Sequence, residues 1–357
     1  MFGFQLPRFL GRQQPPVPYG GQPVVRGVNL GGWLVLEKWM TPDLFTEGAE
    51  DESSLCRQAD WATLGRIREH RETFITREDF EWLAGQGISA VRLPIGYWVF
   101  GGAEPYRPTV RYVDRAFAWA QETGIQVLLC LHGAPGSQNG NDHSGQAGAV
   151  NWDKDEANVV RSLEVVMQLA KRYAGHPALL GFELLNEPSP KLDRRMLKRY
   201  YEAGYRIVRD ACGNTPWVVF SDGLTPQRWR RILTGPAYTN VYIDTHQYQV
   251  FSEADKQLGP VGHIRKTVSE VARSLRKMGR YHQAIVGEWS VALDPASLQG
   301  FTPEQQELAY QTFGAVQLLV YGQARAWFYW SYKTAEGGAW SFRDCVARGW
   351  LPGFGKA

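Results

Sequence analysis

The sequence has few cysteines, and none of them is placed as a metal-binding pair. Only four occur in 357 residues, at positions 56, 130, 212 and 345. There is no C-x-x-C pair, and Cys130 lies inside the apolar run VLLC. The spacing excludes a zinc site built from cysteines and a dense disulfide framework, and it predicts buried or free thiols.

Long apolar runs are also lacking. No stretch approaches the roughly 20 apolar residues that a membrane helix needs, so we expect no membrane partner. The opening segment, MFGFQLPRFLGRQQPPVPYGG, does not have the basic start and unbroken apolar stretch of a signal peptide, because Gln5, Pro7 and Arg8 interrupt it. We therefore expect a cytoplasmic protein, or a secreted one if a leader has been removed before position 1.

The chain carries almost no excess of charge of either sign. Lys and Arg number 39 against 36 Asp and Glu, a formal net charge of +3. The most basic stretch, RRMLKRYYEAGYRIVRD, has apolar residues at helical spacing, so it is interpreted as the solvated face of a helix. This pattern gives no support to a nucleic-acid partner, and it leaves the oligomeric state open. The 14 Trp and 16 Tyr suit both core packing and stacking on sugar rings.

Short apolar runs alternate with longer amphipathic ones after a Pro- and Gly-rich lead at residues 1–23. The alternation predicts a single α/β domain at residues 24–357, a (β/α)₈ TIM barrel with extended loops at its C-terminal face. The longest predicted connections are residues 37–58 and 133–152. The eight strand candidates lie at residues 24–32, 90–98, 126–133, 180–188, 217–223, 240–248, 283–290 and 325–332.

Polar side chains are concentrated at the ends of these strand candidates. In a barrel they would converge on one rim, where the active sites of such barrels are built. The group comprises Glu37, Arg92, His132, Asn186, Glu187, His246, Tyr248, Glu288 and Trp330.

Two of these side chains, Glu187 and Glu288, form a pair of carboxylates on opposite strands. Cleavage of a glycosidic bond needs such a pair, one protonated to donate to the leaving oxygen and one ionised. Arg92 would hold the ionised partner in its charged form. Taken singly, each of these residues also has a structural interpretation as a salt-bridge or core residue. Glu183, one layer deeper in the barrel, is given a structural role, pairing with a buried cation or another polar group.

Several sequence blocks resemble glycoside hydrolase family 5, in its exo-β-1,3-glucanase branch known from yeasts. The similarity runs over nearly the whole chain from about residue 24. It is carried by RGVNLGGWLVLEKWMTPDLF, VRLPIGYW, LHGAPGSQNG, LLNEPS, HQYQVF and GEWS. The resemblance implies a retaining barrel glycosidase without cofactor or metal, which releases glucose from the non-reducing ends of β-1,3-glucans.

The resemblance also implies a role for each site residue. Glu187 would be the general acid/base and Glu288 the nucleophile. The substrate-binding residues would be Glu37, Arg92, His132, Asn139, Asn186, His246, Tyr248, Phe251 and Trp330.

The sequence departs from the family pattern in the loop after the third strand. Asn141 stands where the family usually has a Phe that forms an aromatic clamp with the counterpart of Phe251, and His143 stands where it tends to have Asn. These departures concern the binding of the leaving group, not the chemistry at the terminal glucose.

Other functions share parts of this pattern. A β-glucosidase, a β-1,6-glucanase or a glucosylceramide hydrolase would use the same carboxylates, and the last would need an apolar patch beside the pocket. A non-catalytic sugar-binding barrel would have lost one carboxylate. A metal-dependent hydrolase would show H-x-H or H-E-x-x-H spacing, and a nucleotide enzyme G-x-G-x-x-G or a P-loop, and none of these is present.

Overall fold

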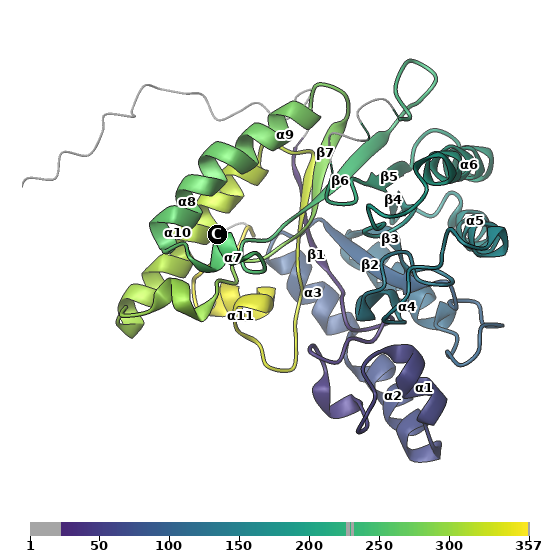
Figure 1. Ribbon diagram of the computed structural model, residues 1–357, viewed down its shortest axis with the longest axis horizontal. Coiled ribbons are helices and arrows are strands. Elements are labelled where there is room, and N and C mark those ends of the chain that lie inside the picture. Colours follow the sequence, from purple (N-terminus) through teal and green to yellow (C-terminus); the bar gives the residue numbers. More distant parts are fainter. Residues whose placement is uncertain (1–22, 226–228, 230–231, 356–357) are drawn as a thin grey trace, which may run out of the picture.

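The computed structural model describes residues 23–225, 229 and 232–355. The predicted lead therefore lies, except for Pro23, outside the described residues. Eight parallel strands close into a barrel in the order of the sequence, which confirms the predicted (β/α)₈ fold (Figure 1). The strands are β1 Val25–Asn29, β2 Ala90–Gly96, β3 Gln126–Gly133, β4 Leu179–Glu183, β5 Trp217–Ser221, β6 Val241–Gln247, β7 Gln283–Trp289 and β8 Ala326–Tyr329.

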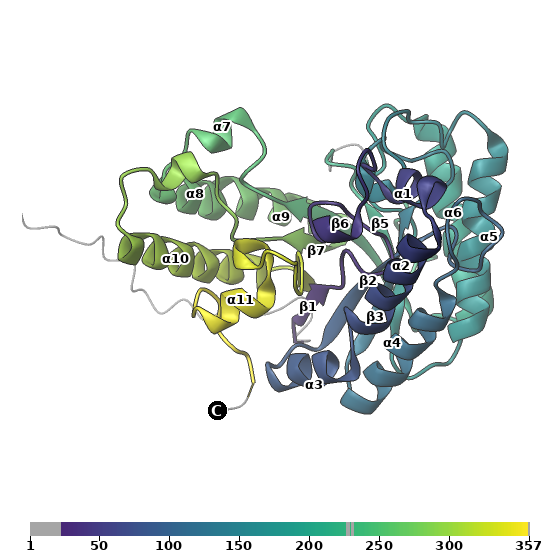
Figure 2. The ribbon, with the colours of Figure 1, turned by 90° about the horizontal axis from the view of Figure 1, so that it is seen from below.

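Helices surround this barrel, with α4, α5 and α6 on one side of the strands and α8, α9 and α10 on the other (Figure 2). Among the described residues, none of the helices has the length and apolar character needed to cross a membrane. The helices are α1 Glu52–Gln58, α2 Trp61–Thr73, α3 Arg77–Gly85, α4 Val110–Thr123, α5 Glu156–Tyr173, α6 Arg194–Cys212, α7 Glu253–Lys256, α8 Pro260–Lys266, α9 Ala272–Met278, α10 Pro303–Tyr321 and α11 Phe342–Ala347.

The helix boundaries follow from local sequence signals. Thr76 is the N-cap of α3, and its backbone N–H donates to the Asp79 carboxylate at 2.9 Å. The helical pattern at residues 263–279 is interrupted by a five-residue π-helix between α8 and α9. Within it the Thr267 hydroxyl donates to the His263 carbonyl at 2.9 Å, a bond that competes with the regular helical pattern.

The lower half of the barrel interior is filled with large apolar side chains. Leu128, Trp217, Tyr242, Ile285 and Phe328 belong to one buried cluster there. A larger apolar cluster lies between the strands and the helices, so the strands are buried on both faces. This apolar filling leaves only the C-terminal half of the barrel for polar groups.

The loops that follow β1 and β3 are the long connections predicted from the sequence. The first loop carries α1 and α2. These two helices are joined by an ion pair at 2.6 Å between the buried side chains of Glu52 in α1 and Arg71 in α2. All four cysteines are free; three are buried and Cys212 is half-buried, as the sequence predicts.

Candidate active site

Arg92, on β2, forms the polar floor of the site inside the barrel. Its side chain is fully buried, and its Nε and Nη2 donate to the two carboxylate oxygens of Glu183 at 2.6 and 3.0 Å. Its Nη1 donates to Glu288 at 2.9 Å and to the Asn29 side-chain oxygen at 2.8 Å, and Nη2 donates to the Asn186 side-chain oxygen at 2.7 Å. Glu183 therefore has the buried cation that the sequence predicts, because a buried charge is tolerated only when it is paired and hydrogen-bonded.

Glu288 lies at the end of β7 and is held from two sides. Besides Arg92, the Tyr248 hydroxyl donates to its Oε2 at 2.8 Å. Burial raises the pKa of Glu288 above its ordinary value, against the opposing effect of the charges on His246 and Arg92. Its two oxygens are thus fixed in direction by donors that come from different strands.

Glu187 lies four residues beyond the end of β4, where the backbone is unusual. Its φ of 40° is in the left-handed region, immediately before Pro188. The Asn139 side-chain amide donates to the Glu187 carbonyl at 3.2 Å, which helps to hold this turn. A residue kept in so unfavourable a conformation is held there by its surroundings, and such strain is concentrated at functional sites.

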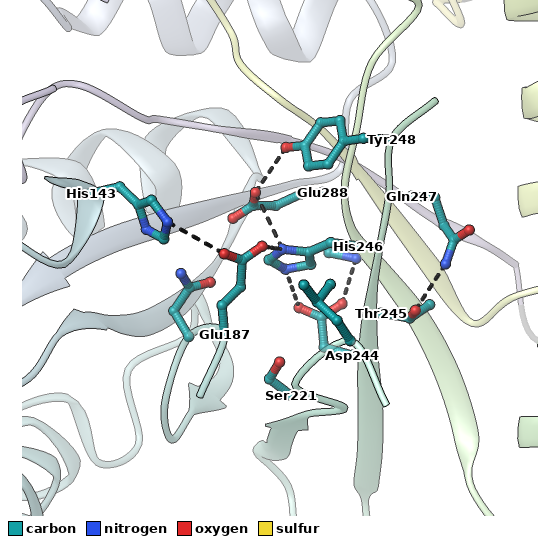
Figure 3. A network of polar contacts seen from close by, with 12 residues as sticks. His143, Glu187, Ser221, Asp244, Thr245, His246, Gln247, Tyr248 and Glu288 are labelled. Carbon is teal, nitrogen blue, oxygen red and sulfur yellow. Dashed lines mark hydrogen bonds and ion pairs between the residues drawn. The ribbon is translucent and has the colours of Figure 1, made fainter. Parts of the chain in front are cut away.

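The Glu187 carboxylate contacts two histidines (Figure 3). His246 Nδ1 lies 2.6 Å from its Oε1, and His143 Nε2 lies 3.4 Å from its Oε2. Burial would raise the pKa of Glu187, but His246 and His143 outweigh it and lower this pKa to about 2. In the free site the contacts with these histidines therefore favour the ionised form of Glu187.

His246, on β6, lies between carboxylates on both sides of its ring (Figure 3). Its Nε2 is 3.2 Å from Asp244, whose other oxygen accepts from the Gly287 N–H at 2.6 Å. Burial would lower the pKa of His246, but Glu288, Asp244 and Glu187 raise it well above its ordinary value. With a carboxylate at each nitrogen, the surroundings favour the imidazolium form of His246, in which both nitrogens carry hydrogen.

The two catalytic candidates are brought close together. Oxygen atoms of Glu187 and Glu288 and a nitrogen of His246 lie within 4.8 Å of one another. Such a group could in principle hold a cation. Here the charged form of His246 is favoured and Arg92 Nη1 already lies 2.9 Å from Glu288, so positive charge on both sides disfavours a metal ion. The arrangement fits proton transfer and attack by a carboxylate better than metal binding.

A pocket of about 660 Å³ opens above this group. Within it His132 lies parallel to Trp330 at 5.5 Å, and Glu37 accepts a hydrogen bond from Trp39 Nε1 at 2.9 Å. Eight residues predicted from the sequence line it, namely Glu37, His132, Glu187, His246, Tyr248, Phe251, Glu288 and Trp330. Three others support the pocket from below or behind, since Arg92 and Asn186 are fully buried and Asn139 binds the Glu187 backbone.

Sequence reasoning missed several residues that contribute to the pocket. Trp39, Leu224 and Trp340 line it, and Asp244 orients His246 from below. Trp39 could have been found from its position two residues after Glu37, and Asp244 from its position two residues before His246 on one strand face. Leu224 lies in the loop after β5 and Trp340 in the loop after β8, and the sequence of neither loop points to the pocket.

A closed (β/α)₈ barrel with two facing carboxylates at the C-terminal ends of its strands defines the class of barrel glycoside hydrolases. The family model described as Cellulase (glycosyl hydrolase family 5) matches residues 62–336. The chain belongs to glycosyl hydrolase family 5.

Curated relatives share about a third of their residues with this chain. A glucan 1,3-beta-glucosidase of Blumeria graminis is 34% identical over 373 residues, which cover 92% of this chain and 86% of the relative. A probable glucan 1,3-beta-glucosidase A of Aspergillus fumigatus is 33% identical, covering 92% and 87%.

Solved structures share the fold at lower identity. A rutinosidase from Aspergillus niger has a TM-score of 0.76 at 20% identity, covering 92% of this chain and 97% of that one. An endoglucanase from Pseudomonas stutzeri has a TM-score of 0.58 at 16% identity, covering 96% and 98%.

Proposed function

We propose that the protein is a retaining, exo-acting β-1,3-glucanase that releases glucose from the non-reducing ends of β-1,3-glucans and their oligosaccharides. The observation that carries the retaining mechanism is that a Glu187 oxygen and a Glu288 oxygen lie within 4.8 Å of each other, both against His246 Nδ1, at 2.6 and 3.3 Å. The carboxyl groups of retaining glycosidases are about 5–5.5 Å apart, whereas those of inverting ones are about 6.5–9.5 Å apart to admit a water molecule, so this close approach of the nearest oxygens favours the retaining arrangement.

In this proposal Glu288 is the nucleophile and Glu187 the general acid/base. A Glu288 oxygen forms a bond to the anomeric carbon while the bond to the leaving oxygen breaks, and that oxygen takes a proton from Glu187. Water then gives its proton to Glu187 and its oxygen to the anomeric carbon, which releases Glu288 and glucose in the β configuration. Arg92 and Tyr248 orient Glu288 for the attack, because both donate to its oxygens.

The proton for the first step is stored on His246. Its Nδ1 lies 2.6 Å from Glu187, so moving one proton across this contact gives a protonated Glu187 and a neutral His246. The net charge of the site stays the same during this transfer. A sugar that enters the site expels water. This desolvation disfavours the ion pair of Glu187 and His246, so it favours the protonated Glu187 and the neutral His246.

The pocket supports recognition of one terminal glucose. Loops after β1, β3, β4, β5, β6 and β8 contribute to its lining, together with His132, His246 and Glu288 on the strands, so residues from most of the barrel rim surround the catalytic pair. Burial raises the pKa of Glu37 well above its ordinary value. Among the described residues its Oε1 has no hydrogen-bond partner, so it is free for a sugar hydroxyl. Trp330 offers a ring for stacking against the sugar.

The preference for β-1,3 links is supported by the relatives named glucan 1,3-beta-glucosidase, which match over 92% of this chain. The same carboxylate pair would serve a β-glucosidase, a β-1,6-glucanase or a glucosylceramide hydrolase.

The test of the proposed function is a time course on laminarin and on β-1,3-, β-1,4- and β-1,6-linked glucose disaccharides, followed by proton NMR. Glucose alone, released first as the β anomer and fastest from the β-1,3 link, is expected. A ladder of oligosaccharides or the α anomer would contradict the proposal.

A second prediction concerns the pH dependence of the proposed reaction. The site is inactive once the Glu187–His246 pair has lost its shared proton, and the raised pKa of His246 keeps that proton to high pH. In His246→Gln the proton must be held by Glu187 alone, so the alkaline limb of kcat/KM should move to lower pH by about one unit or more.

The matched control is His143→Asn, which removes the more distant histidine at 3.4 Å from Glu187. Its alkaline limb should move much less. An unchanged alkaline limb in His246→Gln, measured with the same disaccharide, would show that His246 does not store the proton.

A further inference from the structure

A second pocket lies between α2 and the start of α4. It is formed by side chains from residues 61–71 of α2 and from residues 107–112, which lead into α4, and its volume is about 440 Å³. Its lining residues differ from all those of the active-site pocket. α2 lies beside α1 at the periphery of the molecule (Figure 1). The proposed reaction therefore gives this pocket no role.

Positive charge is the main feature of this second pocket. Among the residues that the structure describes, none of its lining side chains is acidic, and four are arginines, namely Arg68, Arg71, Arg107 and Arg111. Arg111 shares the carboxylate of Glu72 with Arg115, so one negative charge faces two positive ones. Within the described part of the chain, Arg68 and Arg107 form no ion pair. The pocket thus has an excess of positive charge, which favours an anion.

Arg71 provides a buried donor in the same pocket. Its side chain is only 2% exposed, and its Nη2 donates to Glu52 at 2.6 Å. Its Nε has no hydrogen-bond partner among the described residues. A buried N–H without an acceptor is costly, so the ion pair with Glu52 explains only part of this guanidinium. An anion in the pocket would supply the acceptor.

The exposed face of α2 carries two further residues that the free protein does not explain. Trp61 is 90% exposed, and Gly65, one turn later on the same face, lies inside the helix, where glycine is disfavoured relative to alanine. A Cβ built at Gly65 would meet no atom within 4 Å, so packing does not require glycine there. Its absence leaves open space on the helix between the Trp61 ring and Arg68. A flat ligand lying on the helix would use both the ring and this space.

We infer that this pocket is a second binding site, which takes a small phosphomonoester attached to a ring. The ring would lie on Trp61 over Gly65, and the phosphate would accept hydrogen bonds from Arg68, Arg71 and Arg107. Guanidinium groups suit this ligand because their planar fork matches the oxygens of a phosphate. The volume lies within the range of about 300–1,000 Å³ that is usual for small-molecule sites. A sugar phosphate and a nucleotide share this chemistry.

The test is isothermal titration calorimetry of the full chain at about 0.15 M salt, with glucose 6-phosphate, adenosine monophosphate, inorganic phosphate, glucose and adenosine. At least one of the two ring phosphates should bind about 10-fold or more tightly than inorganic phosphate and than its own unphosphorylated counterpart. The tighter of the two identifies the kind of ring. If inorganic phosphate binds as tightly as both, the pocket holds an adventitious ion only and the inference fails. It fails equally if none of the phosphates binds.

Gly65→Leu locates the site. Leucine is a better helix former than glycine, and the space around Gly65 is open, so thermal unfolding should occur at the same or a higher temperature. The leucine side chain would fill the space over the helix, so the affinity for the ring phosphate should fall about 10-fold or more. Unchanged affinity in this variant would place the ligand elsewhere, for example in the glucose site, and would overturn the assignment.

Arg107→Ala tests the charge of the pocket without changing its shape at α2. The affinity for the ring phosphate should fall about fivefold or more, because an exposed guanidinium is lost from the rim. The control is Arg199→Ala, which removes an exposed arginine of α6 and should leave the affinity unchanged. Equal affinities in the two variants would contradict the inference. Hydrolysis of laminaribiose without added phosphate should be the same in all three variants, since none of these residues lines the active-site pocket.

Discussion

Replacing Glu288 by Gln is expected to lower kcat by about 10⁴-fold or more on every glucoside, because an amide cannot attack the anomeric carbon. The variant should remain folded. Gln is close in shape to Glu, and its oxygen can still accept from Arg92 Nη1, which lies 2.9 Å from the carboxylate in the native site. Thermal unfolding of the variant should therefore stay near that of the unaltered chain. Near-normal turnover would refute the assignment of Glu288 as nucleophile.

The companion change, Glu187→Gln, tests whether Glu187 has a different role in the reaction from Glu288. On laminaribiose the loss should also reach several orders of magnitude, because the leaving sugar needs a proton. On dinitrophenyl β-glucoside, whose leaving group needs none, the first step should survive and a glucosyl-enzyme should accumulate. Added azide should then restore turnover by attacking that intermediate without a general base. Equal losses on both substrates would contradict the role of Glu187 as acid/base.

The largest effect on stability is expected for Arg92→Met. The change leaves the carboxylates of Glu183 and Glu288 buried without their cation, and breaking such a buried pair costs about 3–5 kcal/mol of unfolding free energy. Activity should be lost as well, because Glu288 loses one of its two orienting donors. Unfolding by guanidinium chloride, followed by fluorescence of the many tryptophans, gives the stability difference.

A surface arginine of the same chain provides the control. Arg77 also contacts two glutamates, Glu81 and Glu122, each at 2.7 Å, but its side chain is 49% exposed. Arg77→Met should change the unfolding free energy by about 1 kcal/mol or less, because water screens the lost pairs. Similar losses in the two variants would mean that burial does not set the cost of removing Arg92.

The barrel and most of the site could be predicted because their signals are local. Strands buried on both faces appear as short apolar runs, and residues such as Glu187 and Glu288 follow or end such runs. Once the topology places all strand ends on one rim, the convergence of these side chains follows without further information. The pairing of Glu183 was predictable from the same local signal, because a carboxylate inside an apolar strand must be paired or hydrogen-bonded to be buried.

Other parts of the site could not be obtained in this way. Trp340 reaches the pocket through the loop after β8. Its neighbours Trp39 and Phe251 lie in the loops after β1 and β6, which are far from it along the chain. The sequence also gives no sign that the Asn139 amide donates to the Glu187 carbonyl, because this bond joins the loops that follow two different strands. Nor does the sequence show where the proton lies, because that depends on the distances from His246 to three carboxylates.

The catalytic groups and the outer lining of the pocket have different structural origins. Arg92, His246 and Glu288 are carried by strands and Glu187 follows β4 closely, whereas the outer lining residues Phe251, Leu224 and Trp340 are carried by loops. A loop can change in length or composition without altering the register of the barrel, since connecting segments tolerate insertion and substitution. Natural variation could thus alter which alcohol or sugar is released while the bond-breaking chemistry is inherited unchanged. Within this architecture, reaction and specificity can evolve separately.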